Sequence, residues 1–153
     1  GYICLEDVMP AVHALQLWGY QVKIGSSVGA QDHQFAGSDE ERAKDLQQML
    51  DDPSISAILF GRGGYGAIRI IDKINFNQFY LHPKWLIGYS DITVLHSHIH
   101  RNCHVATLHA TMPVNFKLDL FSTESLRKAL MGIHEEYKTG NKIPVRNLPG
   151  KAK

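Results

Sequence analysis

Short apolar runs alternate with amphipathic helical segments along this chain, and this alternation constrains the fold more than any other feature of the sequence. Strands that alternate with helices form βαβ crossovers, in which helices cover a parallel sheet. Apolar runs at 55–60, 85–89 and 104–108 predict three strands, and an alternating stretch at 20–24 predicts a fourth. The mostly apolar run at 55–60 is typical of a central strand that is covered on both faces. We therefore predict an α/β fold with a parallel sheet and helices on both faces.

Helical patterns fill the spaces between these strands. Apolar residues recur at three- and four-residue spacing over 5–18, which predicts an amphipathic helix that ends at Gly19. Ser38 followed three residues later by Glu41 forms a capping box and predicts a helix from 39 to about 50. Similar patterns predict three more helices, at 64–74, 91–102 and 122–131.

The length of the chain fits one domain. With 153 residues, of which 44% are hydrophobic, the chain can build one well-packed core and is too short to divide comfortably into two. We place this domain at 1–137 and interpret the basic, Gly- and Pro-punctuated stretch at 138–153 as the start of a linker. The helical pattern begins at Leu5 without the apolar strand that usually opens an α/β domain, so we expect the domain to lack its first strand.

Charge and composition disfavour several classes of partner. The 16 Lys and Arg residues nearly balance the 15 Asp and Glu residues, which argues against binding to nucleic acid or to an anionic membrane and favours a small molecule or peptide. No stretch has the pattern of a signal peptide or membrane span, and two distant cysteines fit a reducing cytoplasm. Nine histidines include His96 and His100 at helical spacing, but no third ligand stands near them, so we predict neither metal nor cofactor.

The first candidate site is the stretch Gly61-Arg62-Gly63-Gly64-Tyr65-Gly66, which follows one predicted strand and precedes a helix. Ligands of open parallel sheets bind beyond the carboxyl ends of the strands. Exposed N–H groups of such a turn suit a carboxylate, a phosphate or a developing oxyanion. The glycine spacing matches neither the dinucleotide nor the phosphate-loop motif, and a plain glycine turn is the alternative interpretation.

The second candidate site is Ser90, where the apolar run at 85–89 meets a helical pattern. A sharp strand-to-helix turn of this kind is a nucleophile elbow, which exposes the serine hydroxyl and points the next N–H, that of Asp91, at the oxyanion position. Gly88 supplies room for the turn, but Ile92 replaces the last glycine of the usual motif. Taken alone, this junction favours the plainer interpretation, in which Ser90 or Asp91 caps the following helix.

Two motifs together resemble the LD-carboxypeptidase family of serine peptidases, which includes the microcin-C immunity proteins. The first is Gly61-Arg62-Gly63-Gly64-Tyr65-Gly66-Ala67-Ile68-Arg69, and the second is Ile87-Gly88-Tyr89-Ser90-Asp91-Ile92-Thr93-Val94-Leu95-His96. The resemblance implies an N-terminal α/β domain like that of class I glutamine amidotransferases, with a flavodoxin-like sheet, joined to a smaller C-terminal domain. A third element reads His-Gly-Pro-Met in relatives and His109-Ala110-Thr111-Met112 here, which puts the local turn in doubt.

The resemblance also assigns roles to residues. Ser90 is the expected nucleophile, and the oxyanion hole is expected from the Asp91 N–H and a backbone N–H of the Gly63-Gly64 turn. Three residues are expected to border the pocket of a small peptide substrate: Arg62, Tyr65 and His109. The implied reaction releases a terminal D-alanine from cytoplasmic murein tetrapeptides, and Arg62 is a candidate for the free carboxylate because its guanidinium can pair both oxygens.

The base of this reaction is expected elsewhere. In the family a Glu and a His from the C-terminal domain complete the triad, and no residue of this sequence matches them. Without a base the hydroxyl is a poor nucleophile, so we expect the 153-residue chain alone to be inactive. A triad completed within the chain is an alternative, and His109 is then better placed than His96.

Other functions compete with the hydrolase. One is a non-catalytic binding module for a small anionic ligand, and another is a hydrolase of a different peptide-like amide. A glutamine amidotransferase-like or flavodoxin-like function is disfavoured, because no cysteine occupies the elbow and no Ser- or Thr-rich phosphate loop is present. A face left bare by an absent domain would also be compatible with a homodimer.

Overall fold

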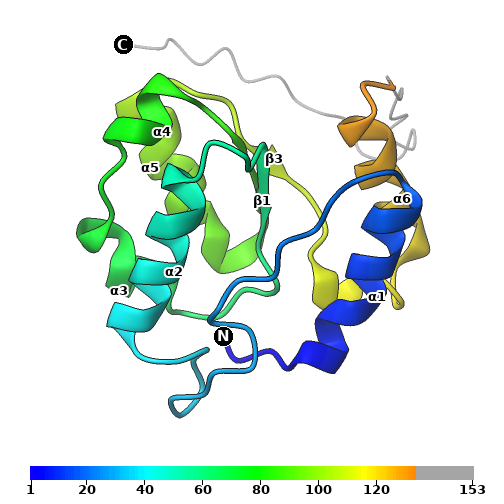
Figure 1. The fold of residues 1–153 in the computed structure, drawn as a ribbon, viewed down its shortest axis with the longest axis horizontal. Coiled ribbons are helices and arrows are strands. Elements are labelled where there is room, and N and C mark those ends of the chain that lie inside the picture. The colour runs from blue at the N-terminus through cyan, green and yellow to red at the C-terminus, as the bar shows by residue number, and fades with distance from the viewer. Residues whose placement is uncertain (134–153) are drawn as a thin grey trace, which may run out of the picture.

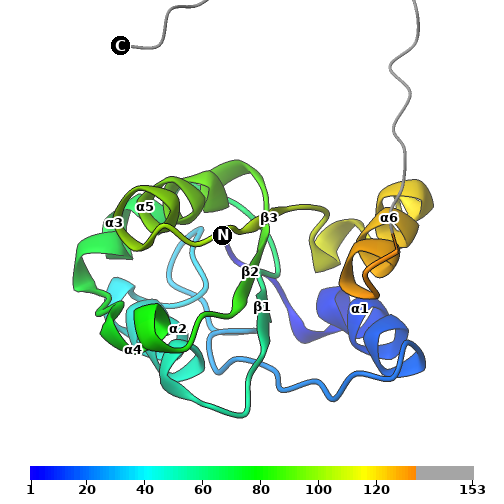
Figure 2. The ribbon, with the colours of Figure 1, turned by 90° about the horizontal axis from the view of Figure 1, so that it is seen from above.

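Three parallel strands form the sheet in the computed structural model, which describes residues 1–133. Strand β1 (Ala57–Leu59) pairs with β2 (Trp85–Gly88), and β2 pairs with β3 (Leu108–His109), so that the strand order is β1-β2-β3 (Figures 1 and 2). In this register Leu59 lies beside Ile87, and Ile87 lies beside Leu108. The predicted domain boundary at 137 and the predicted linker at 138–153 lie outside the described residues.

Helices cover both faces of this sheet, as predicted. Helices α1 (Leu5–Leu17) and α6 (Leu120–Leu130) lie on one face, and a 3₁₀ turn at Pro113–Asn115 packs beside α1 (Figure 2). Helices α2 (Asp39–Asp51), α4 (Asn77–Leu81) and α5 (Thr93–Cys103) lie on the other face (Figure 1). None of the helices described within residues 1–133 is both long and apolar enough to cross a membrane.

Local sequence signals explain where helix α2 begins. The Ser38 hydroxyl accepts a hydrogen bond from the Glu41 backbone N at 3.2 Å, and the Glu41 carboxylate accepts one from the Ser38 backbone N at 2.8 Å. The capping box is therefore confirmed, and it satisfies two backbone groups that the first turn would leave unpaired.

The core lies on both sides of the sheet. The larger cluster fills the space between the sheet and the helices α2, α4 and α5, and Leu86, Phe79 and Ile99 in it are fully buried. The smaller cluster joins α1 and α6 to the sheet through Ala11, Ile87, Phe116 and Leu126. Phe79 belongs to α4, a helix that the sequence patterns did not predict.

Two strand predictions were wrong in ways that share one cause. The segment 20–24 is extended but forms no strand, and β1 lies at an edge of the sheet with Ala57 exposed, whereas a central, covered strand was predicted. An alternating pattern becomes a strand only where a neighbouring strand offers hydrogen-bond partners. Within residues 1–133 the segment 20–24 pairs with no strand, and β1 pairs with a strand on one side only, that of β2.

Several boundaries also differ from the predictions. The helix predicted at 64–74 is the short helix α3 (Ala67–Ile70) followed by a 3₁₀ turn at Ile71–Lys73. The strand predicted at 104–108 begins four residues later, at Leu108, because His104 takes a left-handed conformation (φ 56°) and ends α5. Trp85, which an apolar strand context predicts as core, is 50% exposed on β2.

Candidate active site

Ser90 occupies a strained turn at the carboxyl end of β2. Its φ is +62°, in the left-handed region, and a 3₁₀ turn at Ser90–Ile92 leads directly into α5. This conformation costs a non-glycine residue about 1–2 kcal/mol, and such strain is concentrated at functional sites. The side chain is exposed, and its hydroxyl makes no hydrogen bond within residues 1–133. The turn thus has the form of the predicted nucleophile elbow.

Gly88 and Ile92 explain how the elbow stays tight without the last glycine of the usual motif. A Cβ placed on Gly88 would lie 3.1–3.3 Å from three side-chain carbons of Ile92. Ile92 is buried and packs into the space that the missing Cβ leaves. The glycine before the serine therefore makes room for a large residue after it.

The Gly63-Gly64 turn lies directly against the elbow. A Cβ on Gly63 would stand 3.2 Å from both Cβ and Oγ of Ser90, and 3.5 Å from the backbone N of Asp91. Gly64 has a φ of +112°, which L side chains rarely adopt. The structure therefore brings together the four residues that the sequence assigned to the nucleophile and the oxyanion hole: Ser90, Asp91, Gly63 and Gly64.

The carboxylate of Asp91 has a role that the sequence analysis missed. Its Oδ2 accepts hydrogen bonds from the backbone N atoms of Gly66 and Ala67, each at 2.9 Å. The side chain thus joins the elbow to the end of the glycine turn, 24 and 25 residues earlier in the chain. A helix cap was anticipated at Asp91, but the helix that it caps is α3 and not the one that follows it.

Arg42 on α2 also contacts this turn. Its Nη1 donates to the Gly66 carbonyl at 2.9 Å, and its guanidinium also pairs with Asp39. Asp39 in turn pairs with Arg69 at 2.8 Å, and hydrogen bonding to Arg69 holds the pKa of Asp39 below its ordinary value. Nothing in the local sequence distinguishes Arg42 from the other charged residues of α2, so only the structure identifies it.

Two of the predicted substrate-binding residues lie on this turn, and the third lies at the end of β3. Arg62 and Tyr65 are exposed on the turn, and Arg62 Nη1 donates to the Tyr2 carbonyl at 2.9 Å. His109 is exposed at the end of β3, with its ring centroid 6.1 Å from that of Tyr89. The Tyr89 hydroxyl accepts a hydrogen bond from Asn115 Nδ2 at 2.6 Å, a contact that the sequence gave no reason to expect.

The histidines near the elbow contact groups other than Ser90 within residues 1–133. His109 makes no hydrogen bond to Ser90 in this part of the chain. His96 is buried, and its Nε2 lies 2.9 Å from the Gly88 carbonyl, so this nitrogen carries the proton. His100 is exposed, unlike His96, and the described residues contain no group of three or more His, Cys, Asp or Glu side chains placed to hold a metal.

Comparison with known proteins places these motifs in one family. A sequence model described as "LD-carboxypeptidase N-terminal domain" matches residues 3–110. The "Probable murein peptide carboxypeptidase" of Bacillus subtilis is 43% identical over 98 residues, which cover 64% of this chain and 31% of that protein. The "Murein tetrapeptide carboxypeptidase" of Pseudomonas aeruginosa is 31% identical over 157 aligned positions, which cover 94% of this chain and 49% of that protein.

Solved structures agree with the fold. The crystal structure of an MccF-like protein from Bacillus anthracis superposes with a TM-score of 0.75 at 25% identity, over 84% of this chain and 40% of that chain. The chain thus spans between about a third and a half of the length of the relatives compared here.

Proposed function

This chain belongs to the LD-carboxypeptidase family, and we propose that its full-length form is a serine peptidase that releases a terminal D-amino acid from murein-type tetrapeptides. The curated relatives reported above are named as carboxypeptidases of murein peptides. The observation that carries the proposal is the strained, exposed Ser90 with the Gly63 backbone and the Asp91 N–H packed beside it.

In the proposed reaction Ser90 Oγ attacks the carbonyl carbon of the terminal amide. The carbonyl oxygen becomes an oxyanion and accepts hydrogen bonds from the Asp91 N–H and from a backbone N–H of the Gly63-Gly64 turn. The amine of the D-amino acid leaves, and water then attacks the acyl-enzyme to regenerate Ser90. Removal of a single oxyanion-hole donor typically lowers kcat by about 10²- to 10³-fold.

The proton of Ser90 needs a base, and no side chain within residues 1–133 is hydrogen-bonded to the Ser90 hydroxyl. We assign this role to the Glu and His that the family resemblance places in a C-terminal domain, and we therefore expect the 153-residue chain alone to be inactive. The glutamine amidotransferase-like topology is part of the same proposal. So is a cytoplasmic location, which the free thiols of Cys4 and Cys103 support.

Arg62 is our candidate for recognition of the terminal carboxylate. It stands on the turn that packs against the elbow, and its side chain is exposed. Arg62 Nη1 donates to the Tyr2 carbonyl, and this hydrogen bond anchors the guanidinium. The other N–H groups of the guanidinium remain for a ligand. Tyr65 stands on the same turn and is 84% exposed, and His109 stands at the end of the neighbouring strand β3, with its ring 6.1 Å from that of Tyr89.

A specific contact disfavours the competing function, a binding module for a small anion. The N–H groups at the start of α3 would be the natural anion site of the glycine turn. Two of them, from Gly66 and Ala67, already donate to the Asp91 carboxylate. The protein's own carboxylate therefore occupies the position that a bound phosphate would take.

The experiment that tests the proposal is hydrolysis of an L-lysyl- or diaminopimelyl-D-alanine tetrapeptide by the full-length protein. Release of D-alanine should disappear in Ser90→Ala and persist in Ser97→Ala, a matched control because Ser97 is also exposed on the following helix. Release that survives Ser90→Ala would remove Ser90 as nucleophile. No release by the unmodified protein, together with Ser90-dependent cleavage of other amides, would change the substrate but not the chemistry.

A further inference from the structure

His96 lies in the core beside the carboxyl end of β2. It belongs to α5, the helix that follows the Ser90 turn, and its side chain is buried. Its Nε2 donates a hydrogen bond to the Gly88 carbonyl at 2.9 Å, across eight residues of the chain. This bond therefore closes the corner at which β2 turns through Ser90 into α5.

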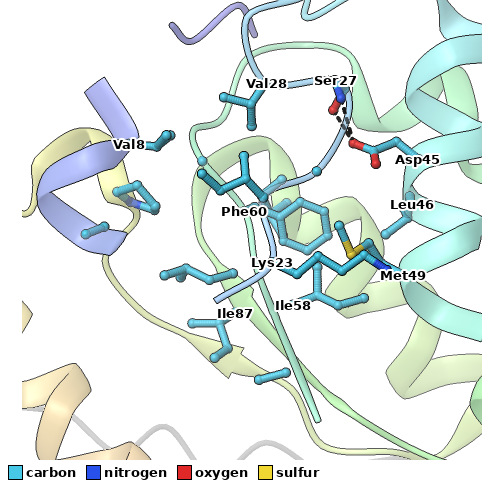
Figure 3. Close-up of a pocket in the computed structure, with 18 of the residues that line it drawn as sticks. Val8, Lys23, Ser27, Val28, Asp45, Leu46, Met49, Ile58, Phe60 and Ile87 are labelled. Carbon is cyan, nitrogen blue, oxygen red and sulfur yellow. Dashed lines mark hydrogen bonds between the residues drawn. The ribbon is translucent and has the colours of Figure 1, made fainter. Parts of the chain in front are cut away.

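The Gly88 carbonyl is the last one of β2 and stands two residues before Ser90. Side chains alternate along a strand: Ile87 lines a cavity of about 970 Å³ that α1 also borders (Figure 3), so Gly88 faces the α5 side of the sheet. From β3, the Ala110 N donates to the same carbonyl at 3.3 Å, which is long for an N–H···O bond. Within residues 1–133 His96 thus supplies the shorter of the two hydrogen bonds to this carbonyl.

The stability of the core does not explain a histidine at this position. The other ring nitrogen of His96, Nδ1, is buried and has no hydrogen-bond partner within residues 1–133. A buried polar atom without a partner lowers the stability of the fold. If His96 were apolar, the Gly88 carbonyl would still accept from the Ala110 N. An apolar side chain of similar size would therefore suit this part of the core at least as well.

The backbone of Ser90 gives the hydrogen bond a function. Its φ of +62° is strained for a residue with a side chain, and such a conformation persists only where the surrounding structure holds it. We propose that His96 is a positioning residue, whose Nε2–H holds the Gly88 carbonyl and thereby keeps Ser90 Oγ and the Asp91 N–H aligned for the reaction. This inference rests on the proposed function and adds to it a residue behind the elbow.

The test compares His96→Met with His96→Gln in the full-length protein. Both substitutions remove the ring, whose centroid lies 6.3 Å from that of His109, and both introduce unbranched side chains of similar length. Glutamine keeps an N–H donor for the Gly88 carbonyl, and methionine has none. The difference between the two variants therefore isolates the hydrogen bond. His100→Met is the control, because His100 is exposed on the same helix.

Kinetics and stability should respond in opposite ways. We expect His96→Met to lower kcat for D-alanine release by about 10- to 100-fold, with less than about a threefold change in KM. His96→Gln should recover most of this loss, and His100→Met should show none. The urea midpoint of His96→Met should equal or exceed that of the unmodified protein, because the substitution removes the unpartnered Nδ1.

A second measurement does not depend on the substrate. Backbone NMR shifts of Ser90 report its left-handed conformation, and we expect them to change in His96→Met and to stay near the unmodified values in His96→Gln. If the unmodified protein releases no D-alanine, the proposed function fails. The Ser90 shifts then still decide whether the His96 hydrogen bond holds the elbow.

Three outcomes would overturn the positioning role. Equal kcat values for His96→Met and His96→Gln would assign the effect to the ring and not to the hydrogen bond. A lower urea midpoint in His96→Met, in proportion to its loss of activity, would show that the histidine only stabilises the fold. Unchanged Ser90 shifts in His96→Met would show that other contacts fix the turn.

Discussion

The Asp91 carboxylate accepts a hydrogen bond from the backbone N of Gly66 at 2.9 Å. Through this contact the residue after the nucleophile holds the far end of the glycine turn that packs against the nucleophile. A backbone donor can stabilise an oxyanion only if it is already in position when the charge develops. The side chain of Asp91 therefore positions the turn, while its own N–H is a proposed oxyanion donor.

Loss of the Asp91 carboxylate should lower kcat more than it raises KM. In the full-length protein we expect Asp91→Ala to lower kcat by about 10- to 100-fold, since small displacements of catalytic groups have effects of this size. Asp91→Asn should recover part of the loss, because its amide oxygen can still accept from the Gly66 N. Steady-state kinetics measure both, with Asp72→Asn as an exposed control; equal activity of the Ala and Asn variants would contradict the positioning role.

Alanine substitutions at Gly63 and Gly64 should have different effects, the first on activity and the second on stability. Gly63→Ala puts a Cβ 3.2 Å from Ser90 Oγ, so we expect kcat/KM to fall by about 10²-fold with little change in the free energy of unfolding. Gly64→Ala places a side chain at a φ of +112°, which should destabilise the fold itself. Tetrapeptide hydrolysis and urea unfolding separate the two effects. Unimpaired hydrolysis by Gly63→Ala would show that the turn stands further from the reacting atoms.

Replacing the nucleophile should reveal the strain at Ser90. Both Ser90→Gly and Ser90→Ala remove the hydroxyl and should abolish hydrolysis. Only glycine relieves the left-handed backbone, so Ser90→Gly should be more stable than Ser90→Ala by about 1 kcal/mol. Urea unfolding of the pair measures this difference directly, and identical midpoints would indicate that the elbow relaxes in solution.

The sequence predicts best where the signal is local. The capping box of Ser38 and Glu41 and the break between strand and helix at Ser90 each involve neighbouring residues, and both are found as predicted. Asp91 and Arg42 contact the glycine turn across 24 or 25 residues, and no spacing rule connects them to it. The family resemblance pointed to residues that the structure places side by side, Gly63, Ser90 and Asp91, but not to the contacts that hold them.

The strand predictions show a second limit. The alternation at 20–24 and the apolar run at 55–60 describe segments that can pair on both sides. Whether each segment forms a paired strand depends on a neighbouring strand, and the residues of that neighbour are not part of the segment's own sequence pattern. Trp85 begins β2 and is nevertheless 50% exposed, because the burial of a strand residue depends on the elements packed over it and not on the strand's own sequence.

The stability of the domain should fall in acid, in part because of Asp39. Hydrogen bonding and the charge of Arg69 hold the pKa of this carboxyl below its ordinary value, so the folded state favours the ionised form. The stabilisation from ionised Asp39 is fully present above the unfolded-state pKa of about 4. It is lost as the pH falls through the lower folded-state pKa. Asp39→Asn should therefore destabilise the domain at pH 7 and reduce the loss of stability between neutral and acidic pH.

The measurement is the midpoint of urea unfolding from about pH 7 to pH 3, for the unmodified chain, Asp39→Asn and Asp72→Asn. Asp72 is exposed and has no ion pair within residues 1–133, so its variant should follow the unmodified curve. We expect Arg42 to keep its hydrogen bond to the Gly66 carbonyl in Asp39→Asn, because that bond does not involve Asp39. If the Asp39 and Asp72 variants show the same pH dependence, the ion pair between α2 and Arg69 contributes nothing to stability in solution.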